Sequence, residues 1–127
     1  YKLDNCQFRP GDPDRVASVF DWDMATLGDP LVDVGICLSY WPYMQGHESL
    51  GLPDKQVFAQ LYAERMQIDP AALRWYEAFA NWRTGVAVQQ LYDRFAGGNS
   101  ADERLANVGK SVLTFLERAE AVMNGDS

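Results

Sequence analysis

The stretch that decides the fold runs from Val16 to Gly35 and reads Val-Ala-Ser-Val-Phe-Asp-Trp-Asp-Met-Ala-Thr-Leu-Gly-Asp-Pro-Leu-Val-Asp-Val-Gly. Four carboxylates, Asp21, Asp23, Asp29 and Asp33, follow directly behind an apolar, strand-like run. These acids need partners, because an unpaired charge at the end of a buried strand is costly. Mg²⁺, a basic side chain or a helix N-terminus would each serve. The choice among them decides what the protein does.

The composition is that of a single globular domain. The 127 residues are 47% hydrophobic, which is enough to bury a core. With 11 basic and 18 acidic residues the net charge is −7, which argues against nucleic acid or an anionic membrane as partner. No apolar run reaches the length of a membrane span. Cys6 and Cys37 lie far apart and outside any C-x-x-C pattern, so we expect small core residues in a reducing, cytoplasmic compartment rather than a zinc site.

Two short apolar runs predict a β-hairpin over about residues 5–20. Strands at 5–9 and 16–20 flank Pro10-Gly-Asp-Pro-Asp-Arg15, which is dense in turn residues. A symmetric hairpin pairs residue 9 with 16 and residue 5 with 20. Asn5 then lies beside Asp21.

Helix signals follow the hairpin. Asp29-Pro30 and Asp69-Pro70 are each an N-cap followed by proline at the first helical position, and Ser100-Ala-Asp-Glu103 is a capping box. We predict helices over residues 30–41, 54–66, 70–96 and 101–123, with 21–29 as the segment that carries the acids. The fold class is therefore mainly α with a small β-hairpin.

Apolar spacing predicts which helix faces pack inward. The predicted inward residues are Leu31, Val34, Leu38 and Trp41; Val57, Phe58, Leu61 and Tyr62; Leu73, Tyr76, Phe79, Ala80, Val86 and Leu91; and Leu105, Val108, Val112, Phe115 and Ala119. A bend is expected at Gly85, and Gly97-Gly-Asn99 ends the third helix. Residues 42–53 are predicted to form a loop, in which His47 is a solvated side chain rather than a catalytic one.

Asn5 and Asp21 are candidate ligands for Mg²⁺. This ion prefers oxygen ligands and takes one or two from protein, with phosphate and water supplying the rest. One amide and one carboxylate at neighbouring strand ends meet that need. The alternative is that both residues only stabilise turns, where Asn and Asp are common.

Three segments, taken in order, resemble the aminoglycoside phosphotransferase and choline kinase family. They are Tyr1-Lys-Leu-Asp-Asn5, Val19-Phe-Asp-Trp-Asp23 and Gly28-Asp-Pro30, followed by Asp33. The family consists of ATP-dependent small-molecule kinases with a protein-kinase-like fold. The resemblance is specific in order and spacing over residues 1–41. Within the family, the sequences of these segments look most similar to those of kinase-like domains that are joined to acyl-CoA dehydrogenases.

The resemblance implies roles for particular residues. Asn5 and Asp21 match the magnesium ligands that hold the metal against the phosphates of ATP. The family's catalytic base belongs to a His-Gly-Asp triplet that stands just before a segment like Tyr1–Asn5. We therefore expect a C-terminal, helical lobe of a longer protein, lacking the N-terminal lobe, without a catalytic base of its own and inactive by itself. Lys2 precedes the metal Asn and does not replace the phosphate-pairing Lys of the missing lobe.

The remaining acids have weaker assignments. Asp23 is either a further metal ligand or metal neighbour, or a surface ion-pair partner. Asp29 and Asp33 are assigned structural support, as the N-cap and first-turn acid of the next helix. The resemblance also suggests that Asp33 braces the catalytic loop.

Trp75, Trp82 and Arg83 are candidates for a substrate pocket. Aromatic residues at helical spacing usually pack in a core. The resemblance, however, places this helix in the half of the fold that receives the acceptor substrate.

The sequence thus supports two hypotheses. In the first, the intact protein uses Mg²⁺ and ATP to transfer the γ-phosphate to a hydroxyl of a small molecule, and an apolar face left by the missing lobe favours a homodimer. In the second, the chain is a non-catalytic helical binding module whose acids merely cap helices. A His-Gly-Asp triplet immediately upstream of Tyr1 is expected only by the first.

Overall fold

The chain begins with a short hairpin and continues as helices. The computed structural model describes residues 3–23, 25–44 and 51–126. Within these ranges the elements are η1 (Leu3–Asn5), β1 (Cys6–Arg9), β2 (Asp12–Val19), α1 (Leu31–Met44), α2 (Lys55–Met66), α3 (Pro70–Ala96), α4 (Arg104–Gly109) and α5 (Val112–Asn124). The prediction of a mainly α fold with a small β-hairpin is confirmed. The predicted loop residue His47 and the excluded Lys2 lie outside the described residues.

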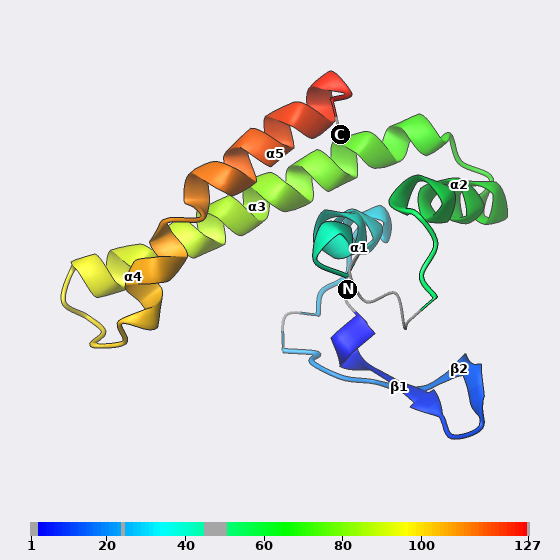
Figure 1. Cartoon of the computed structure of the whole chain (residues 1–127), viewed down its shortest axis with the longest axis horizontal. Coiled ribbons are helices and arrows are strands. Elements are labelled where there is room, and N and C mark those ends of the chain that lie inside the picture. Colours follow the sequence, from blue (N-terminus) through cyan, green and yellow to red (C-terminus); the bar gives the residue numbers. More distant parts are fainter. Residues whose placement is uncertain (1–2, 24, 45–50, 127) are drawn as a thin grey trace.

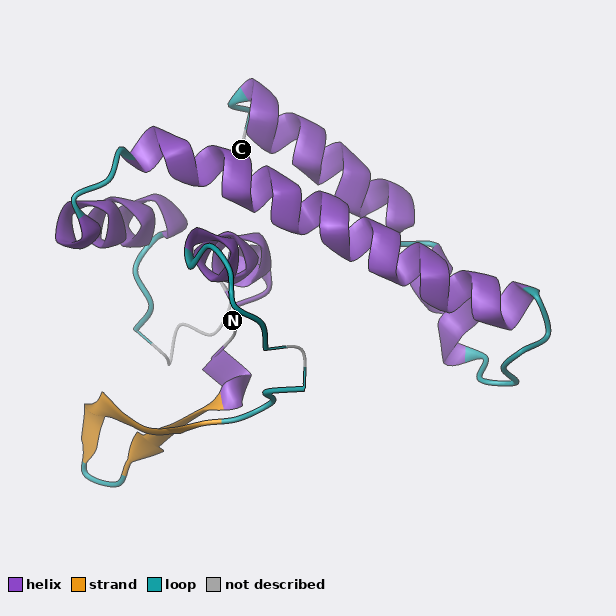
Figure 2. Cartoon of the chain, turned by 180° about the vertical axis from the view of Figure 1, so that it is seen from behind, coloured by secondary structure: helices purple, strands orange, loops and turns teal. Residues whose placement is uncertain are grey.

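Helix α3 is the long axis of the molecule (Figure 1). Helix α5 runs back along it, and α1 crosses it nearer the N-terminal end of α3. The hairpin projects on the far side of α1 from α3, as Figures 1 and 2 show from opposite directions. The segment between β2 and α1 therefore connects the hairpin to the helical body.

The core forms where α1, α2 and α3 meet. Its buried centre consists of Val34, Leu38, Ala63 and Leu73. Partly buried hydrophobic residues pack around it: Leu31, Phe58, Ala59, Tyr62 and Ile68. The ring of Trp41 is buried and stacks on Phe58 with ring centroids 4.5 Å apart.

Gly35 sets the closest approach of α1 to α3. A Cβ atom at this position would collide with the backbone carbonyl of Tyr76. Only glycine allows the two helix backbones to come this close. The sequence indicated a helix through Gly35 but not this crossing point.

The hairpin agrees with the prediction at its base and differs at its tip. Cys6 pairs with Val19, and the amide of Phe20 donates to the carbonyl of Asn5 at 2.8 Å. The predicted pairing of residue 9 with 16 is wrong, because Arg9 pairs with Asp12 and Phe8 with Val16 across register irregularities. The turn is consequently Pro10-Gly11, and β2 extends through Pro13. A two-stranded, exposed hairpin accepts proline because both strands are edge strands.

Two helix boundaries also differ. Helix α1 continues through Pro42 to Met44, whereas residue 42 was predicted to begin a loop. Proline removes one backbone donor and crowds the preceding turn, but here it lies only two residues before the helix ends. The predicted single helix over 101–123 is instead α4 and α5, separated at Lys110–Ser111. Helix α3 runs without interruption through Gly85.

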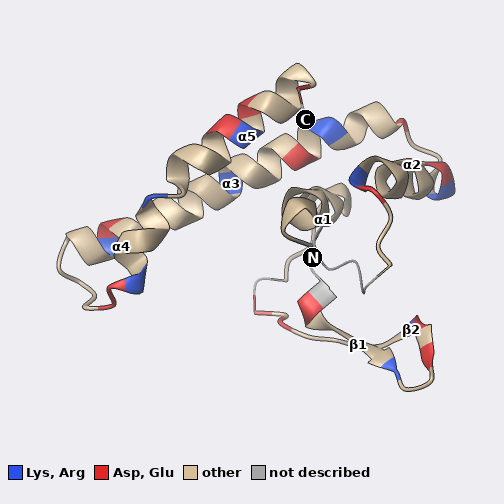
Figure 3. Ribbon diagram, viewed as in Figure 1, with Lys and Arg blue, Asp and Glu red and all other residues tan. Residues whose placement is uncertain are grey.

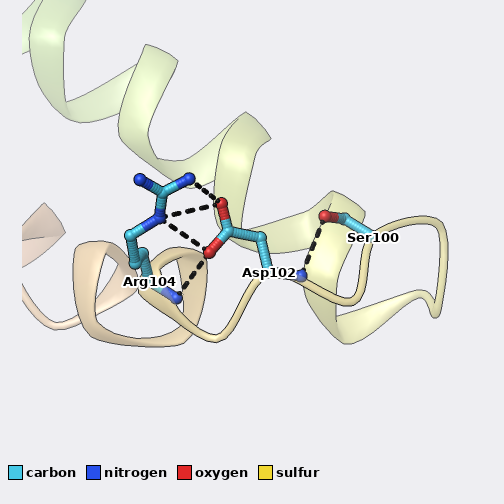
Figure 4. A network of polar contacts seen from close by, with 3 residues as sticks. All are labelled: Ser100, Asp102 and Arg104. Carbon is cyan, nitrogen blue, oxygen red and sulfur yellow. Dashed lines mark hydrogen bonds and ion pairs between the residues drawn. The ribbon is translucent and has the colours of Figure 1, made fainter.

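The predicted capping box at Ser100 and Glu103 is wrong. Figure 4 shows the interaction that replaces it: the Asp102 carboxylate accepts from the Arg104 amide at 3.0 Å and from its guanidinium at 2.7–3.0 Å. The Ser100 hydroxyl accepts from the Asp102 amide at 3.3 Å. The guanidinium of Arg104 lowers the pKa of Asp102, and the carboxylate raises that of Arg104. A local ion pair therefore starts α4 in place of a reciprocal cap.

Four of the predicted inward residues face solvent: Val57 (48% exposed), Leu61 (57%), Val86 (38%) and Leu91 (38%). Val57 and Leu61 are exposed because α2 packs through Ala59, Tyr62 and Ala63, on one side only. None of the helices within the described ranges has the length and apolar character required to cross a bilayer.

Candidate functional site

The structure brings Asn5 and Asp21 together at the base of the hairpin. Asn5 ends η1, and Asp21 follows the end of β2 by two residues. The Asn5 Nδ2 atom donates to Asp21 Oδ2 at 3.1 Å, across 16 positions of sequence. The backbone bond from Phe20 to Asn5 lies directly beside this contact. Hairpin pairing therefore fixes the distance between the two side chains.

Asp21 adopts a left-handed backbone conformation, with φ of +63°. Asp tolerates this region better than most residues but still at a cost. Two neighbouring bonds hold the turn: the Trp22 indole donates to the Val19 carbonyl at 2.8 Å, and the Ala25 amide donates to the Trp22 carbonyl at 2.9 Å. Strained non-glycine residues concentrate at functional sites. The conformation is therefore a feature of interest as well as the end of a strand.

The acidic segment that contains Asp21 carries no basic residue of its own. No Lys or Arg occurs between Val16 and Asp54, and Figure 3 shows acidic but no basic residues along the ribbon between β2 and α1. Within the part of the chain that the structure describes, the ion pairs join Arg15 to Asp12, Lys55 to Glu77 and Arg104 to Asp102. Asp21 is exposed to solvent, so a cation can reach its carboxylate.

The donor set fits a magnesium ion. Mg²⁺ binds oxygen atoms at about 2.0–2.1 Å in octahedral geometry, which places adjacent ligands about 3 Å apart. The Asn5 and Asp21 side chains already lie at this spacing. The amide presents nitrogen rather than oxygen to the carboxylate, and a half-turn of the amide exchanges the two atoms. No group of three or more His, Cys, Asp or Glu residues suited to a metal occurs among the described residues, so a site here depends on this mixed pair.

Asp29 joins two helices. Its Oδ1 atom accepts from the Leu31 amide at 2.9 Å, as an N-cap does, and its Oδ2 atom accepts from the Tyr76 hydroxyl at 2.6 Å. These bonds, above all that from Tyr76, lower the pKa of Asp29, while the carboxylate raises the pKa of Tyr76. Asp33 lies in the first turn of α1, where its amide donates to the Pro30 carbonyl at 3.2 Å.

Asp23 lies in the same exposed segment as Asp21, two residues further along. Its assignment as a further ligand or metal neighbour stays a prediction. The described residues between Asp23 and α1 form no regular helix or strand.

The candidate pocket residues lie on an outward face of α3. The rings of Trp75, Phe79 and Trp82 stack in succession, with centroids 5.3 Å and 5.9 Å apart. Trp75 is 53% and Trp82 50% exposed, so these two side chains are not core residues. Arg83 is the next residue along the helix and is half-buried. We call these three stacked aromatic side chains the α3 aromatic stripe.

Sequence reasoning missed two features. Tyr76 was predicted to face inward, but its bond to the N-cap of α1, 47 residues away in sequence, was not predicted. Lys55 and Glu77 form a largely buried ion pair with 2.9 Å between Nζ and Oε1, in a cleft of about 190 Å³ between α1, α2, α3 and α5. A glutamate within the otherwise apolar face of α3 was the available signal for that pair.

The sequence that forms this site is similar to a known protein family. The model of the phosphotransferase enzyme family matches residues 1–76, which include η1, the hairpin, the acidic segment and α1. The chain belongs to the phosphotransferase enzyme family. The part of the chain that matches the family model contains Asn5, Asp21 and the Asp29–Tyr76 contact.

Longer proteins share this phosphotransferase-family sequence. The chain is 30% identical to acyl-CoA dehydrogenase family member 10 of Mus musculus over 94% of its length, and 31% identical to the probable acyl-CoA dehydrogenase IBR3 of Arabidopsis thaliana over 94%. It is 32% identical to acyl-CoA dehydrogenase family member 11 of Rattus norvegicus over 81%. The chain spans only 12%, 16% and 15% of these three relatives, in that order. No solved structure gives a significant match. The family and the likeness to members joined to acyl-CoA dehydrogenases are thus as predicted from residues 1–41.

Proposed function

We propose that this chain supplies the magnesium-binding half of the active site of an ATP-dependent small-molecule kinase. Membership of the phosphotransferase enzyme family supports phosphoryl transfer as the reaction. The single observation that carries the assignment is the contact between Asn5 and Asp21, which places an amide and a carboxylate at the spacing of adjacent magnesium ligands.

The residues of the site have different proposed roles. Asp21 and Asn5 would hold the ion, which neutralises charge on the phosphate oxygens of ATP when bound. Asp29 and Asp33 position the start of α1 behind them, and Asp23 adds negative charge to the same segment. The hydroxyl acceptor needs a base within hydrogen-bond reach, and we assign this base to an aspartate of the intact protein that precedes Tyr1.

The α3 aromatic stripe is the proposed acceptor surface. The half-exposed rings of Trp75 and Trp82, which stack in succession with Phe79, offer an apolar contact surface to a small molecule. Arg83 adds a positive charge at its edge, which would attract an acceptor that carries a carboxylate or phosphate elsewhere in the molecule.

Phosphoryl transfer by the intact protein tests this proposal. ATP consumption should depend on Mg²⁺ and on the acceptor, and Asp21→Ala should reduce kcat/KM by at least about two orders of magnitude, as expected for loss of a group that neutralises charge in the transition state. Asp14→Ala removes an exposed acid from β2, far from the site along the hairpin, and is the matched control. Full activity of Asp21→Ala would refute the metal role, and the non-catalytic binding module would then be the better account.

A further inference from the structure

The Tyr76 hydroxyl links the acidic segment to a distant part of the sequence. It donates to Asp29 Oδ2 at 2.6 Å, across 47 positions, while the other oxygen of Asp29 caps α1 through the Leu31 amide. One carboxylate thus serves two elements at once. The capping bond requires only the local sequence, whereas the bond to Tyr76 requires α3 to be in place.

The backbone of Tyr76 fixes the same junction from a second direction. Gly35 lies so close to the Tyr76 carbonyl that a methyl group at residue 35 would collide with it. Side chain and backbone of one residue therefore contact both the N-cap and the second turn of α1. These two contacts restrict sliding of α1 along α3 and rotation about its own axis.

The contact between Tyr76 and Asp29 anchors the end of the acidic segment that leads into α1. The segment leaves the hairpin at Phe20, whose amide is bonded to Asn5, and enters α1 at Asp29. Between these points the Ala25 amide donates to the Trp22 carbonyl. The described residues of the segment form no helix or strand, so the segment takes its position from its two ends. The hairpin determines one end, and Tyr76 determines the other.

We propose that Tyr76 is a positioning residue for the metal-binding segment: through Asp29 it holds residues 21–29 so that the Asp21 carboxylate stays beside Asn5. The effect on segment order stands on the contacts alone. The effect on metal binding rests on the proposed function. Tyr76 itself touches neither metal nor substrate in this scheme and acts only through Asp29.

Hydrogen exchange on the intact protein tests the proposal, with Tyr76→Phe as the variant. This change removes one hydroxyl and leaves the ring, including its edge-on contact with Trp75 at 5.0 Å between centroids. We expect the Phe20 and Ala25 amides to exchange several-fold faster, while amides of α5 keep their rates. The apparent affinity for Mg²⁺, titrated in the presence of ADP, should fall several-fold. Tyr92→Phe removes a hydroxyl from the same helix and should change neither quantity.

A second variant separates positioning from general packing. Asp29→Ser keeps an N-cap oxygen but is too short to reach Tyr76, so it should reproduce the faster exchange. The double variant should then be no worse than either single variant, because both remove the same bond. Additive effects would overturn the proposal, as would unchanged exchange at Phe20 and Ala25 in Tyr76→Phe.

The same measurements distinguish the effect of Tyr76 on the order of the segment from its effect on Mg²⁺ binding. Faster segment exchange in Tyr76→Phe together with unchanged Mg²⁺ affinity, in a protein that binds Mg²⁺, would overturn the positioning role for the metal. Faster exchange in a protein whose wild type binds no Mg²⁺ would support the tether while refuting the proposed function.

Discussion

At the scale of single residues, short contacts between distant parts of the chain determine the site. Asn5 meets Asp21 because the base of the hairpin pairs, and Asp21 takes a left-handed conformation where the chain leaves β2. Asp29 meets Tyr76 because Gly35 lets α1 approach α3. Each of these contacts makes a prediction that a single substitution can test.

Gly35→Ala should destabilise the protein by about 1–3 kcal/mol, the usual cost of overpacking a close contact. The added methyl group meets the backbone of Tyr76, which cannot turn aside as a side chain can. Urea denaturation measures the free energy of unfolding. Gly28→Ala is the matched control, because a Cβ there has nothing within 4 Å. Equal stability of the two variants would show that the helix crossing is looser than described.

The Asp29–Tyr76 bond predicts a pH dependence. The pKa of Asp29 is lowered in the folded state, chiefly by the Tyr76 hydroxyl. A lowered pKa adds stability that is fully present above the unfolded-state pKa and disappears as the pH falls through the folded-state value. The free energy of unfolding of the wild type should thus fall more steeply below about pH 4 than that of Asp29→Asn. Parallel curves for the two proteins would contradict this contribution.

At the scale of elements, the sequence predicts those features that depend on local signals. Asp69 before Pro70 begins α3 as expected, with the Asp69 side chain accepting from the Ala71 amide at 2.9 Å. Glycine ends this helix, where Gly98 has φ of +72°. Two element boundaries were less predictable: α1 continues through Pro42, and an ion pair at Asp102 starts a separate α4. Exposure of Val57 and Leu61 could not be seen from the sequence, because periodicity does not tell how many sides of a helix are covered.

If the α3 aromatic stripe receives the acceptor, a substitution in it should weaken acceptor binding in a protein that still folds. Trp82 is 50% exposed but stacks on Phe79, so Trp82→Ala should lower the free energy of unfolding by about 1–2 kcal/mol and leave the protein folded. If the stripe receives the acceptor, the KM for the acceptor should rise while the KM for ATP stays constant. Steady-state kinetics of the intact protein, with Leu113→Ala on exposed α5 as control, provide the measurement. An unchanged acceptor KM would exclude Trp82 from the acceptor site.

At the scale of the whole molecule, the order of motifs was more informative than any single residue. The segments Tyr1–Asn5, Val19–Asp23 and Gly28–Pro30, followed by Asp33, indicated by their order and spacing the family that the comparison establishes. The link from Asp29 to Tyr76 was not predictable in this way, since it joins residues 47 positions apart whose separate roles, cap and core residue, look complete without it. The largely buried Lys55–Glu77 pair was missed for the same reason.

The charge of the molecule supports a cation at the acidic segment. The chain carries a net charge of −7, and its run from Val16 to Asp54 contains no Lys or Arg. A divalent ion placed there would reduce repulsion among these acids. Added Mg²⁺ should therefore raise the melting temperature of the wild type more than that of Asp21→Ala, whereas an equal rise in both would indicate nonspecific screening.

Paramagnetic mapping of the metal tests the central claim most directly. Mn²⁺ takes similar oxygen ligands to Mg²⁺ and broadens the NMR signals of nearby nuclei. In the isotopically labelled intact protein with ADP present, substoichiometric Mn²⁺ should broaden the amide signals around Asn5 and Asp21 first, and excess Mg²⁺ should restore them. The broadening should be absent in Asp21→Ala. Broadening centred on another part of the chain, or unchanged in Asp21→Ala, would contradict the assignment of Asn5 and Asp21 as the magnesium ligands.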